Sequence, residues 1–290
     1  MEGKSIRMME KIGLVLEGGG MRAVYTAGAL EYFLEQDIHF PYVIGVSAGA
    51  SYAASYVSKQ VGRNKKVSLD YVTDPRYMSW RNFRHNRQFF GMDFIYDEIP
   101  SQIVPFDYDA FYANPAQLKI GTTDVMTGES LFYGKEEYKG ELLKVLRASS
   151  SLPFLAPPVM FKDKVLLDGG ISASVPIDIA NQDGYEKNVV ILTRNKGYRK
   201  SKSRFHYFVE KKYPHYKGLQ KMMKERFIHY NKTMDYLDKE EEKGNVLIIR
   251  PLEKLKVGRM ERNPQKLFAL YMQGYEDAKK VLSAVQQFQL

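Results

Sequence analysis

The segment VIGVSAGASYAAS, residues 43–55, places a serine between two glycines, after an apolar run and before a run of small residues. Its core, GVSAG, fits G-x-S-x-G, the nucleophile elbow in which a serine lies on a sharp turn between a strand and a helix. Such a turn needs neighbours without bulk, and Gly45, Ala48 and Gly49 around Ser47 meet that need. The alternative interpretation is an ordinary tight turn of small residues.

Strand–turn–helix units surround this segment. An apolar run at 11–16 predicts a buried strand before a helix over 21–36, and 42–46 predicts a second strand before a helix over 48–59. This repetition is typical of parallel α/β units. The other predicted elements are a hairpin of 117–125 with 129–134, strands at 164–170, 188–194 and 245–251, a helical region at 203–243 and a helix at 264–288.

A second glycine-rich turn, EGGGMR at residues 17–22, follows the first predicted strand. Successive glycine amides at the start of a helix can face an anion with no side chain in the way. Gly18-x-Gly20-x-x-Ala23 also fits the dinucleotide fingerprint, but the acidic residue that should close the second strand is missing. No Gly-Lys-Ser/Thr follows the glycines, which excludes a P-loop.

A nucleophilic serine needs a base. The five histidines, His39, His85, His206, His215 and His229, do not fall in strand-end loops, so a Ser-His-Asp triad of the α/β-hydrolase type is poorly supported. Asp168, in the sequence Asp168-Gly169-Gly170, instead follows the apolar run KVLL. A carboxylate there could reach a serine hydroxyl, whereas the alternative is a plain β-turn, which Asp-Gly commonly makes.

The three motifs in this order resemble the patatin-like phospholipases, also called acyl hydrolases. The resemblance covers about residues 11–180: the oxyanion loop Gly18-Gly19-Gly20-Met21-Arg22, the elbow of Gly45 to Gly49, and Asp168-Gly169-Gly170. RASSSLPFLAPPV (147–159) and ISASVPID (171–178) also look like family segments. One departure is Ala23, where many members have glycine. The implied fold is a three-layer α/β/α domain with a mostly parallel central sheet.

The resemblance also implies a chemistry. Ser47 would be the nucleophile and Asp168 its general base, with oxyanion donors among Gly18, Gly19, Gly20 and Ala48. Arg22, Gly45, Gly49, Gly169 and Gly170 would support them, and for Arg22 we favour bracing of the glycine loop over contact with a substrate phosphate. The implied reaction is hydrolysis of a lipid acyl ester, of phospholipase, lysophospholipase or esterase type, through an acyl-enzyme and without a cofactor or metal.

Bulk composition is compatible with this function. The 290 residues are 44% hydrophobic and 27% charged, enough for a large core, and the absence of cysteine excludes a thiol nucleophile and mildly favours a reducing compartment. The apolar run near the N-terminus is too short for a signal peptide, and no run is long enough to span a membrane. We therefore expect a cytoplasmic protein, peripheral at most to the inner membrane surface.

The net charge of +9 is localised. Residues 194–226 hold 12 Lys or Arg against Glu210 and Glu225, which makes the segment +10 and the remainder −1. Interleaved aromatic residues suit an anionic bilayer or nucleic acid, and the alternative interpretation is simply a solvated charged helix. For a lipid hydrolase, a membrane is the expected partner and nucleic acid is disfavoured. A catalytically weak hydrolase fold that binds an anionic membrane or nucleic acid through this segment remains the alternative.

Two regions frame the expected organisation. A catalytic domain is expected over residues 8–195, with a mostly helical accessory region over 196–290 that completes or covers the core. The aromatic-rich stretch 75–115 is interpreted as packing, or as an apolar cover over the site.

Overall fold

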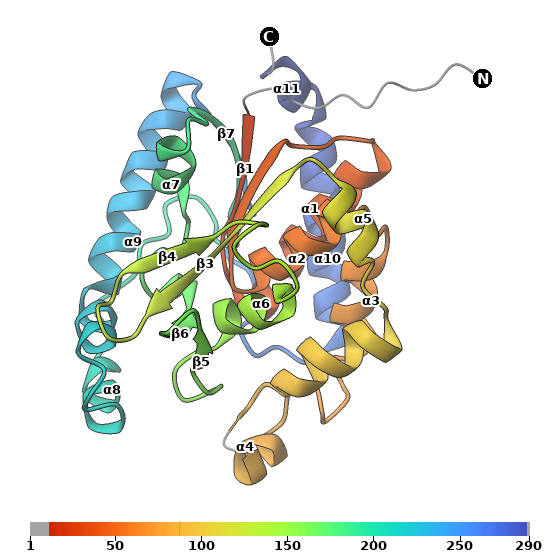
Figure 1. The fold of residues 1–290 in the computed structure, drawn as a ribbon. Helices are drawn as coiled ribbons and strands as arrows, with labels where there is room; N and C mark the ends of the chain where they lie inside the picture. The colour runs from red at the N-terminus through yellow and green to blue at the C-terminus, as the bar shows by residue number, and fades with distance from the viewer. Residues whose placement is uncertain (1–11, 87, 289–290) are drawn as a thin grey trace.

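The structure, a computed structural model, describes residues 12–86 and 88–288, so Lys11 of the first predicted strand and residues 8–11 of the predicted catalytic domain lie outside it. An eight-stranded mixed sheet forms the centre (Figure 1). Its parallel strands are β1 (Ile12–Leu16), β2 (Tyr42–Val46), β3 (Gln117–Asp124), β7 (Lys187–Ile191) and β8 (Val246–Ile249). The antiparallel part comprises β4 (Ser130–Tyr133), β5 (Val159–Phe161) and β6 (Lys164–Asp168).

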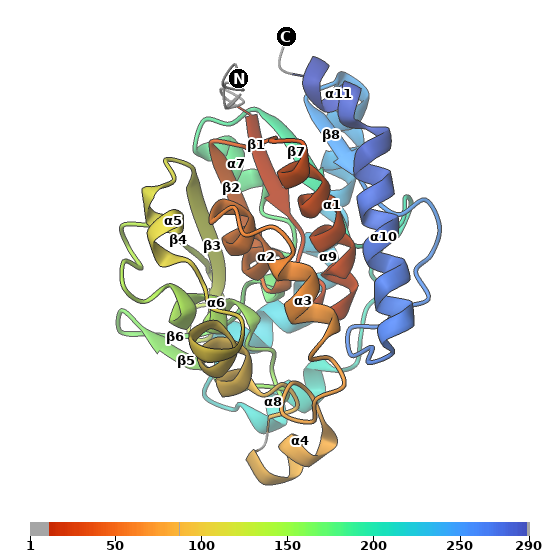
Figure 2. The same ribbon diagram turned by 90° about the vertical axis from the view of Figure 1, so that its right-hand side faces the viewer.

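Helices cover both faces of this sheet, giving three layers (Figures 1 and 2). One face carries α1 (Val24–Glu35), α2 (Ala48–Val57), α3 (Arg63–Leu69), α6 (Leu142–Ser150) and α10 (Pro264–Lys280). The other carries α7 (Ile177–Gln182) and α9 (Lys217–Lys243). β1 is apolar throughout because Leu14 and Leu16 pack on the first face and Val15 on the second. The predicted fold class is confirmed.

Several elements carried too weak a pattern to predict. They are the 3₁₀ turns η1 (Gly20–Ala23) and η3 (Gly169–Ile171), the helices α4 (Trp80–Asn86) and α5 (Tyr108–Ala113), the π-helix η2 (Phe94–Ile103), and also α6, α7 and β5. The predicted helical region 203–243 divides into α8 (His206–Lys212) and α9, since Pro214 forces Tyr213 out of the helical conformation. The predicted C-terminal helix likewise divides at Val281 into α10 and α11 (Leu282–Gln287).

The register along β3 brings distant strands together. β4 pairs with residues 120–123 of β3, which confirms the predicted hairpin and occupies one edge. The opposite edge is shared: residues 117–121 pair with β2, and residues 122–124 pair with β6 running the other way. Val46, the last residue of β2, pairs with Gly121, while Asp168, the last residue of β6, pairs with Thr122. The two strands therefore end against each other on neighbouring positions of β3.

The C-terminal region is joined to the sheet and to the first helix. β8 pairs with β7 at the edge of the sheet, and α10 lies along α1 (Figure 2). Where these helices cross, a Cβ on Gly28 would lie 1.9 Å from the carbonyl oxygen of Tyr271, and a Cβ on Gly274 would lie 1.9 Å from that of Tyr25. Glycine at both positions lets the two backbones touch.

Candidate active site

Ser47 lies on the turn between β2 and α2 with φ 56° and ψ −135°. This conformation is nearly restricted to glycine, so it costs on the order of 1–3 kcal/mol in a residue with a side chain. The neighbours are held close: a Cβ on Gly45 would lie 3.0 Å from the amide nitrogen of Ala50, and one on Gly49 would lie 2.8 Å from the carbonyl oxygen of Glu17. The turn predicted from GVSAG is therefore strained at Ser47 and tightly packed at its two glycines.

A second buried serine, Ser149, holds the elbow in place through two hydrogen bonds. The backbone amide of Ser47 donates to the hydroxyl of Ser149 at 2.7 Å, and this hydroxyl donates to the carbonyl of Gly121 at 2.7 Å. Ser149 belongs to the RASSS segment that resembles the family pattern, but the sequence did not indicate what its hydroxyl binds.

Asp168 closes β6 with its side chain buried beside Ser47. Its Oδ1 accepts a 2.7 Å hydrogen bond from the amide of Gly170, and its Oδ2 has no partner among the described residues. Burial raises the pKa of this carboxyl, while the Ser47 hydroxyl, the charge of Arg226 and the Gly170 amide each act against that rise. The Ser47 hydroxyl is close enough to influence the carboxyl, although the pair does not meet hydrogen-bond geometry in this structure.

The glycine loop lies close to Ser47. A Cβ on Gly18 would lie 3.0 Å from that of Ser47, and the Gly18 amide donates to the carbonyl of Ser174 at 3.4 Å. Within residues 12–86 and 88–288, the amides of Gly19, Gly20 and Ala48 donate to no other group. Of the four predicted oxyanion donors, these three are therefore free to bind a ligand.

Glu17 holds this loop against the sheet. Its Oε2 accepts from the amide and hydroxyl of Thr193, at 2.6 and 2.9 Å, and its Oε1 accepts from the hydroxyl of Tyr230 at 3.2 Å. The carboxylate of Glu17 is thus occupied by neutral donors. No role was predicted for Glu17 beyond its place in EGGGMR.

Ser47 borders two cavities of opposite character. The first cavity is mainly apolar. Much of its wall comes from the aromatic-rich stretch, residues 75–115. Its apolar lining includes Met21, Val67, Tyr77, Phe90, Met92, Ile95, Tyr96, Ile99, Phe106, Leu143, Leu146 and Leu152. The interpretation of this stretch as an apolar wall beside the site agrees with that lining.

The second cavity, which we call the basic cavity, is small and is bordered by Asp168 and the glycine loop as well as by Ser47. Five basic side chains line it: Arg22, Arg194, Lys200, Arg226 and Arg259. Only Arg22 was predicted as a site residue. The others lie far from the three motifs in the sequence, and Arg259 lies in no motif, so only the fold reveals them.

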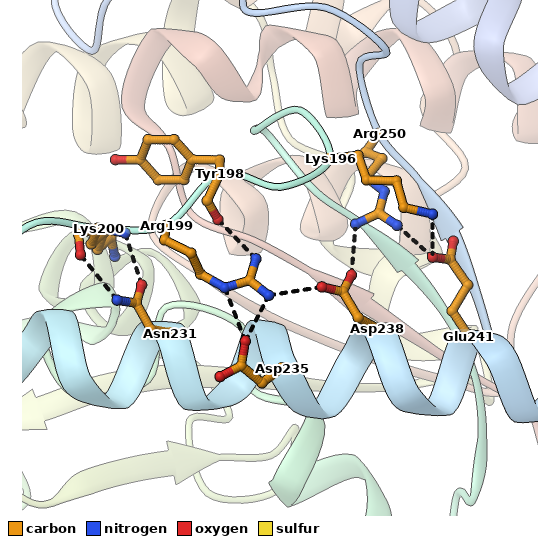
Figure 3. Close-up of polar contacts among 9 residues, drawn as sticks. All are labelled: Lys196, Tyr198, Arg199, Lys200, Asn231, Asp235, Asp238, Glu241 and Arg250. Carbon is orange, nitrogen blue, oxygen red and sulfur yellow. Dashed lines mark hydrogen bonds and ion pairs between the residues drawn. The ribbon is translucent and has the colours of Figure 1, made fainter.

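The basic segment 194–226 therefore has three parts. Arg194, Lys200 and Arg226 line the basic cavity. Lys196 and Arg199 form ion pairs with acidic residues of α9, and the backbone of Lys200 exchanges two hydrogen bonds with Asn231, so that the loop is fixed on the helix (Figure 3). The remaining seven are exposed: Lys202, Arg204, Lys211, Lys212, Lys217, Lys221 and Lys224.

Four of the five histidines lie elsewhere, and the side chain of His85 is outside the described part of the structure. His39 contacts Asp37 at 2.9 Å, His206 contacts the carbonyl of Ser203, and neither these nor His215 or His229 line the cavities that Ser47 borders. In the part of the chain that the structure describes, no cluster of His, Asp and Glu could hold a metal ion. No helix over the same residues is long and apolar enough to cross a bilayer.

The chain belongs to the patatin-like phospholipase family, whose model matches residues 14–181. A second model, a domain of unknown function (DUF6363), matches residues 216–289, the region that supplies Arg226 and Arg259. The uncharacterized protein YjjU of Escherichia coli K12 is 29% identical over 196 residues, which are 63% of this chain and 52% of that protein.

Two further comparisons extend the match. The lysophospholipase NTE1 of Candida albicans is 25% identical over 197 residues, 63% of this chain but 13% of that protein. The chain thus spans about half, or much less, of the length of these relatives. The crystal structure of VipD from Legionella pneumophila superimposes with a TM-score of 0.55 over 94% of this chain and 67% of that one at 15% identity, which shows a shared fold.

Proposed function

We propose that this protein is a carboxylic ester hydrolase acting on lipid acyl esters, of phospholipase A or lysophospholipase type, with Ser47 as nucleophile and Asp168 as general base. One observation carries the proposal: the strained Ser47 lies beside a buried carboxylate whose Oδ2 has no other partner among the described residues. The family and the lysophospholipase relative support the lipid substrate.

In the first half of the reaction, Ser47 Oγ attacks the ester carbonyl carbon while its proton passes to Asp168. The carbonyl oxygen becomes negatively charged and accepts hydrogen bonds from the amides of Gly19, Gly20 and Ala48, which begin with no other acceptor. The positive end of α2 adds to this stabilisation. When the intermediate collapses, the bond to the leaving alcohol breaks and Asp168 returns the proton to that oxygen.

In the second half, water attacks the acyl-enzyme and gives its proton to Asp168. Collapse of this intermediate breaks the bond to Ser47 Oγ, which recovers the proton, and the fatty acid leaves. An ordinary aspartate, with a pKa of about 4, is a weak base for serine. Burial raises the pKa of Asp168, and the fixed elbow positions the hydroxyl before reaction, so both effects assist the transfer.

The apolar cavity is the proposed site of the acyl chain. It begins at Ser47 and is lined by aliphatic, methionine and aromatic side chains. Burying an acyl chain among them contributes about 25 cal/mol of binding free energy per Å² of apolar surface removed from water. An ester bound with its chain in this cavity presents its carbonyl to the elbow and its leaving group to the basic cavity.

We also propose a peripheral contact with an anionic membrane. Phe205, Tyr207 and Phe208, at the start of α8, are 41%, 61% and 63% exposed, and four of the exposed cations, Lys202, Arg204, Lys211 and Lys212, flank them in the sequence. Trp80 of α4 is 67% exposed, and α4 and α8 lie at the same end of the molecule (Figures 1 and 2). Aromatic and basic side chains together suit an anionic bilayer surface.

Activity-based labelling combined with kinetics tests the catalytic proposal. We expect a fluorophosphonate to label the wild-type protein at Ser47, and Ser47→Ala and Asp168→Asn each to abolish cleavage of a chromogenic acyl ester while the circular dichroism spectrum is kept. Turnover that persists in either variant excludes the dyad. A wild-type protein that neither reacts with the probe nor cleaves the ester is a binding module instead.

A further inference from the structure

We propose that the basic cavity binds the phosphate of a lipid substrate and selects head groups that end in a phosphomonoester. Arg226 and Arg259, contributed by the C-terminal region, are its specificity-determining residues. This inference rests on the proposed function, because it places the leaving group of the ester that Ser47 attacks.

The cavity has too few carboxylates for its cations. Five basic and two acidic side chains line it, so the basic groups outnumber the carboxylates. The oxygens of Glu17 are hydrogen-bonded to Thr193 and Tyr230, and within the described residues Glu17 forms no ion pair with the cations. Arg22 is only 4% exposed, its Nε has no partner, and its guanidinium forms no hydrogen bond or ion pair with any described residue. The expected bracing of the glycine loop by Arg22 would need such bonds, so a ligand is the better explanation for this cation.

The other cations lack acidic partners as well. Within the described part of the chain, the side chains of Arg194 and Arg259 form no ion pair. Lys200 Nζ contacts the Ser174 hydroxyl at 2.9 Å and lies 3.7 Å from the centre of the Tyr230 ring, and Arg226 Nε donates to the carbonyl of Gly170 at 2.9 Å. A bound anion would supply the missing negative charge.

Burial and mutual repulsion together lower the pKa values of these cations, against the opposing charge of Glu17. Burial, followed by the charges of Arg259 and Arg194, lowers the pKa of Arg22 to about 10. Burial, followed by the charge of Arg259, lowers the pKa of Arg226 to about 10. Burial and the charge of Arg226 hold the pKa of Lys200 well below its ordinary value. An anion placed among these groups would raise all three pKa values, so its binding is favoured.

Position connects the cavity to catalysis. Gly20, Ser47 and Leu152 border both cavities, so one molecule can place its acyl chain in the first and its polar end in the second. A phosphate lies a few bonds from the acyl ester in a glycerophospholipid, which suits neighbouring cavities. Guanidinium groups bind phosphate oxygens in pairs of charge-assisted hydrogen bonds.

Charge favours a phosphomonoester over a diester. A monoester carries about −1.5 to −2 charges at pH 7, which matches the cationic excess better than the single charge of a diester. A choline or ethanolamine group would add a positive charge to a cavity that already has too many.

The test compares two lysophospholipids with the same acyl chain, one ending in phosphate and one in phosphocholine. We expect wild type to prefer the phosphate lipid by kcat/KM, chiefly through KM, and Arg226→Gln and Arg259→Gln each to reduce that preference about tenfold or more, as for loss of a charge-assisted hydrogen bond. The ratio of the two lipids cancels any effect of Arg226 on Asp168. Lys239→Gln, an exposed cation on α9, should leave the ratio unchanged. Equal kcat/KM for the two lipids in wild type, or an undiminished preference in both arginine variants, overturns the proposal.

A binding measurement separates this proposal from the catalytic one. Calorimetric titration of folded Ser47→Ala protein with inorganic phosphate should show binding that the additional Arg226→Gln change weakens, even if no ester is cleaved. Absence of heat in that titration, together with no competition by phosphate against the phosphate lipid, contradicts an anion site. Competition by free phosphate without any preference between the lipids would mean that the cavity binds a soluble phosphate and not a lipid head group, which also overturns the proposal.

Discussion

The amide of Ser47 and the hydroxyl of Ser149 form a 2.7 Å hydrogen bond that ties the elbow to α6, and the same hydroxyl continues to the carbonyl of Gly121 on β3. One buried side chain therefore satisfies one backbone group of the elbow and one of β3. Because Ser149 is fully buried, water cannot replace it at either group.

Ser149→Ala should lower the free energy of unfolding by about 2 kcal/mol, since it leaves a buried amide and a buried carbonyl unpaired. It should also lower kcat about tenfold or more with little change in KM, because the elbow loses its fixed position. Urea unfolding and steady-state ester hydrolysis measure both effects. Ser151→Ala is the control, because its hydroxyl bonds only the carbonyl of Arg147 within α6; an equal loss of kcat there would contradict the role of Ser149.

Strain at Ser47 predicts a gain in stability from an inactivating change. Ser47→Gly should be more stable than Ser47→Ala by about 1 kcal/mol, since glycine adopts φ 56° and ψ −135° freely while alanine keeps the penalty. Both variants should be inactive. Urea unfolding of the pair measures the difference, and a glycine variant less stable than the alanine variant would show that the elbow is relaxed.

The pH profile of kcat/KM should show an acid limb. Asp168 must be ionised to accept a proton, and burial raises its pKa, so activity should rise through a midpoint above the ordinary value of about 4 and then level off. The charge of Arg226 lowers this pKa, so Arg226→Gln should move the limb to higher pH. Hydrolysis of an uncharged ester across pH 4 to 8 tests both statements, and a shift to lower pH would be evidence against Asp168 as the base.

The stability of Asp168→Asn should depend on pH with a definite sign. A carboxyl whose pKa is higher in the folded state than in the unfolded state destabilises the fold once it ionises. The asparagine variant should therefore be at least as stable as wild type above the folded pKa, and this advantage should vanish below the unfolded pKa. Thermal unfolding at several pH values measures it; an asparagine variant markedly less stable at neutral pH would mean that the charge itself supports the fold.

Vesicle binding should need both exposed aromatic side chains and anionic lipid. Changing Phe205 and Phe208 together to serine should weaken co-sedimentation with phosphatidylglycerol-containing vesicles, and added salt should weaken it further because the cations contribute. Val61→Ser, which removes a side chain 60% exposed outside α4 and α8, is the matched control. Equal binding of wild type and the double variant would exclude α8 as the contact.

The fold class and the central motifs were predictable because they depend on local chemistry. Glycines around Ser47 indicate a tight turn, and apolar runs such as that of β1 indicate strands buried on both faces. Helices such as α6 and η2 were not predicted, because such short segments become helical through tertiary packing and have only a weak sequence pattern. Pro100 inside η2 also argues against a helix. The basic cavity was not predictable, since Arg22, Arg226 and Arg259 meet only through the folded chain.

The close backbone contact of α1 with α10, at Gly28 and at Gly274, has a practical consequence for anyone who truncates this protein. A fragment limited to residues 14–181 retains every motif of the hydrolase but leaves the apolar face of α1 bare and loses both β7 and β8. Such a fragment should aggregate when expressed alone, so recombinant work needs the C-terminal half even when only the chemistry at Ser47 is of interest.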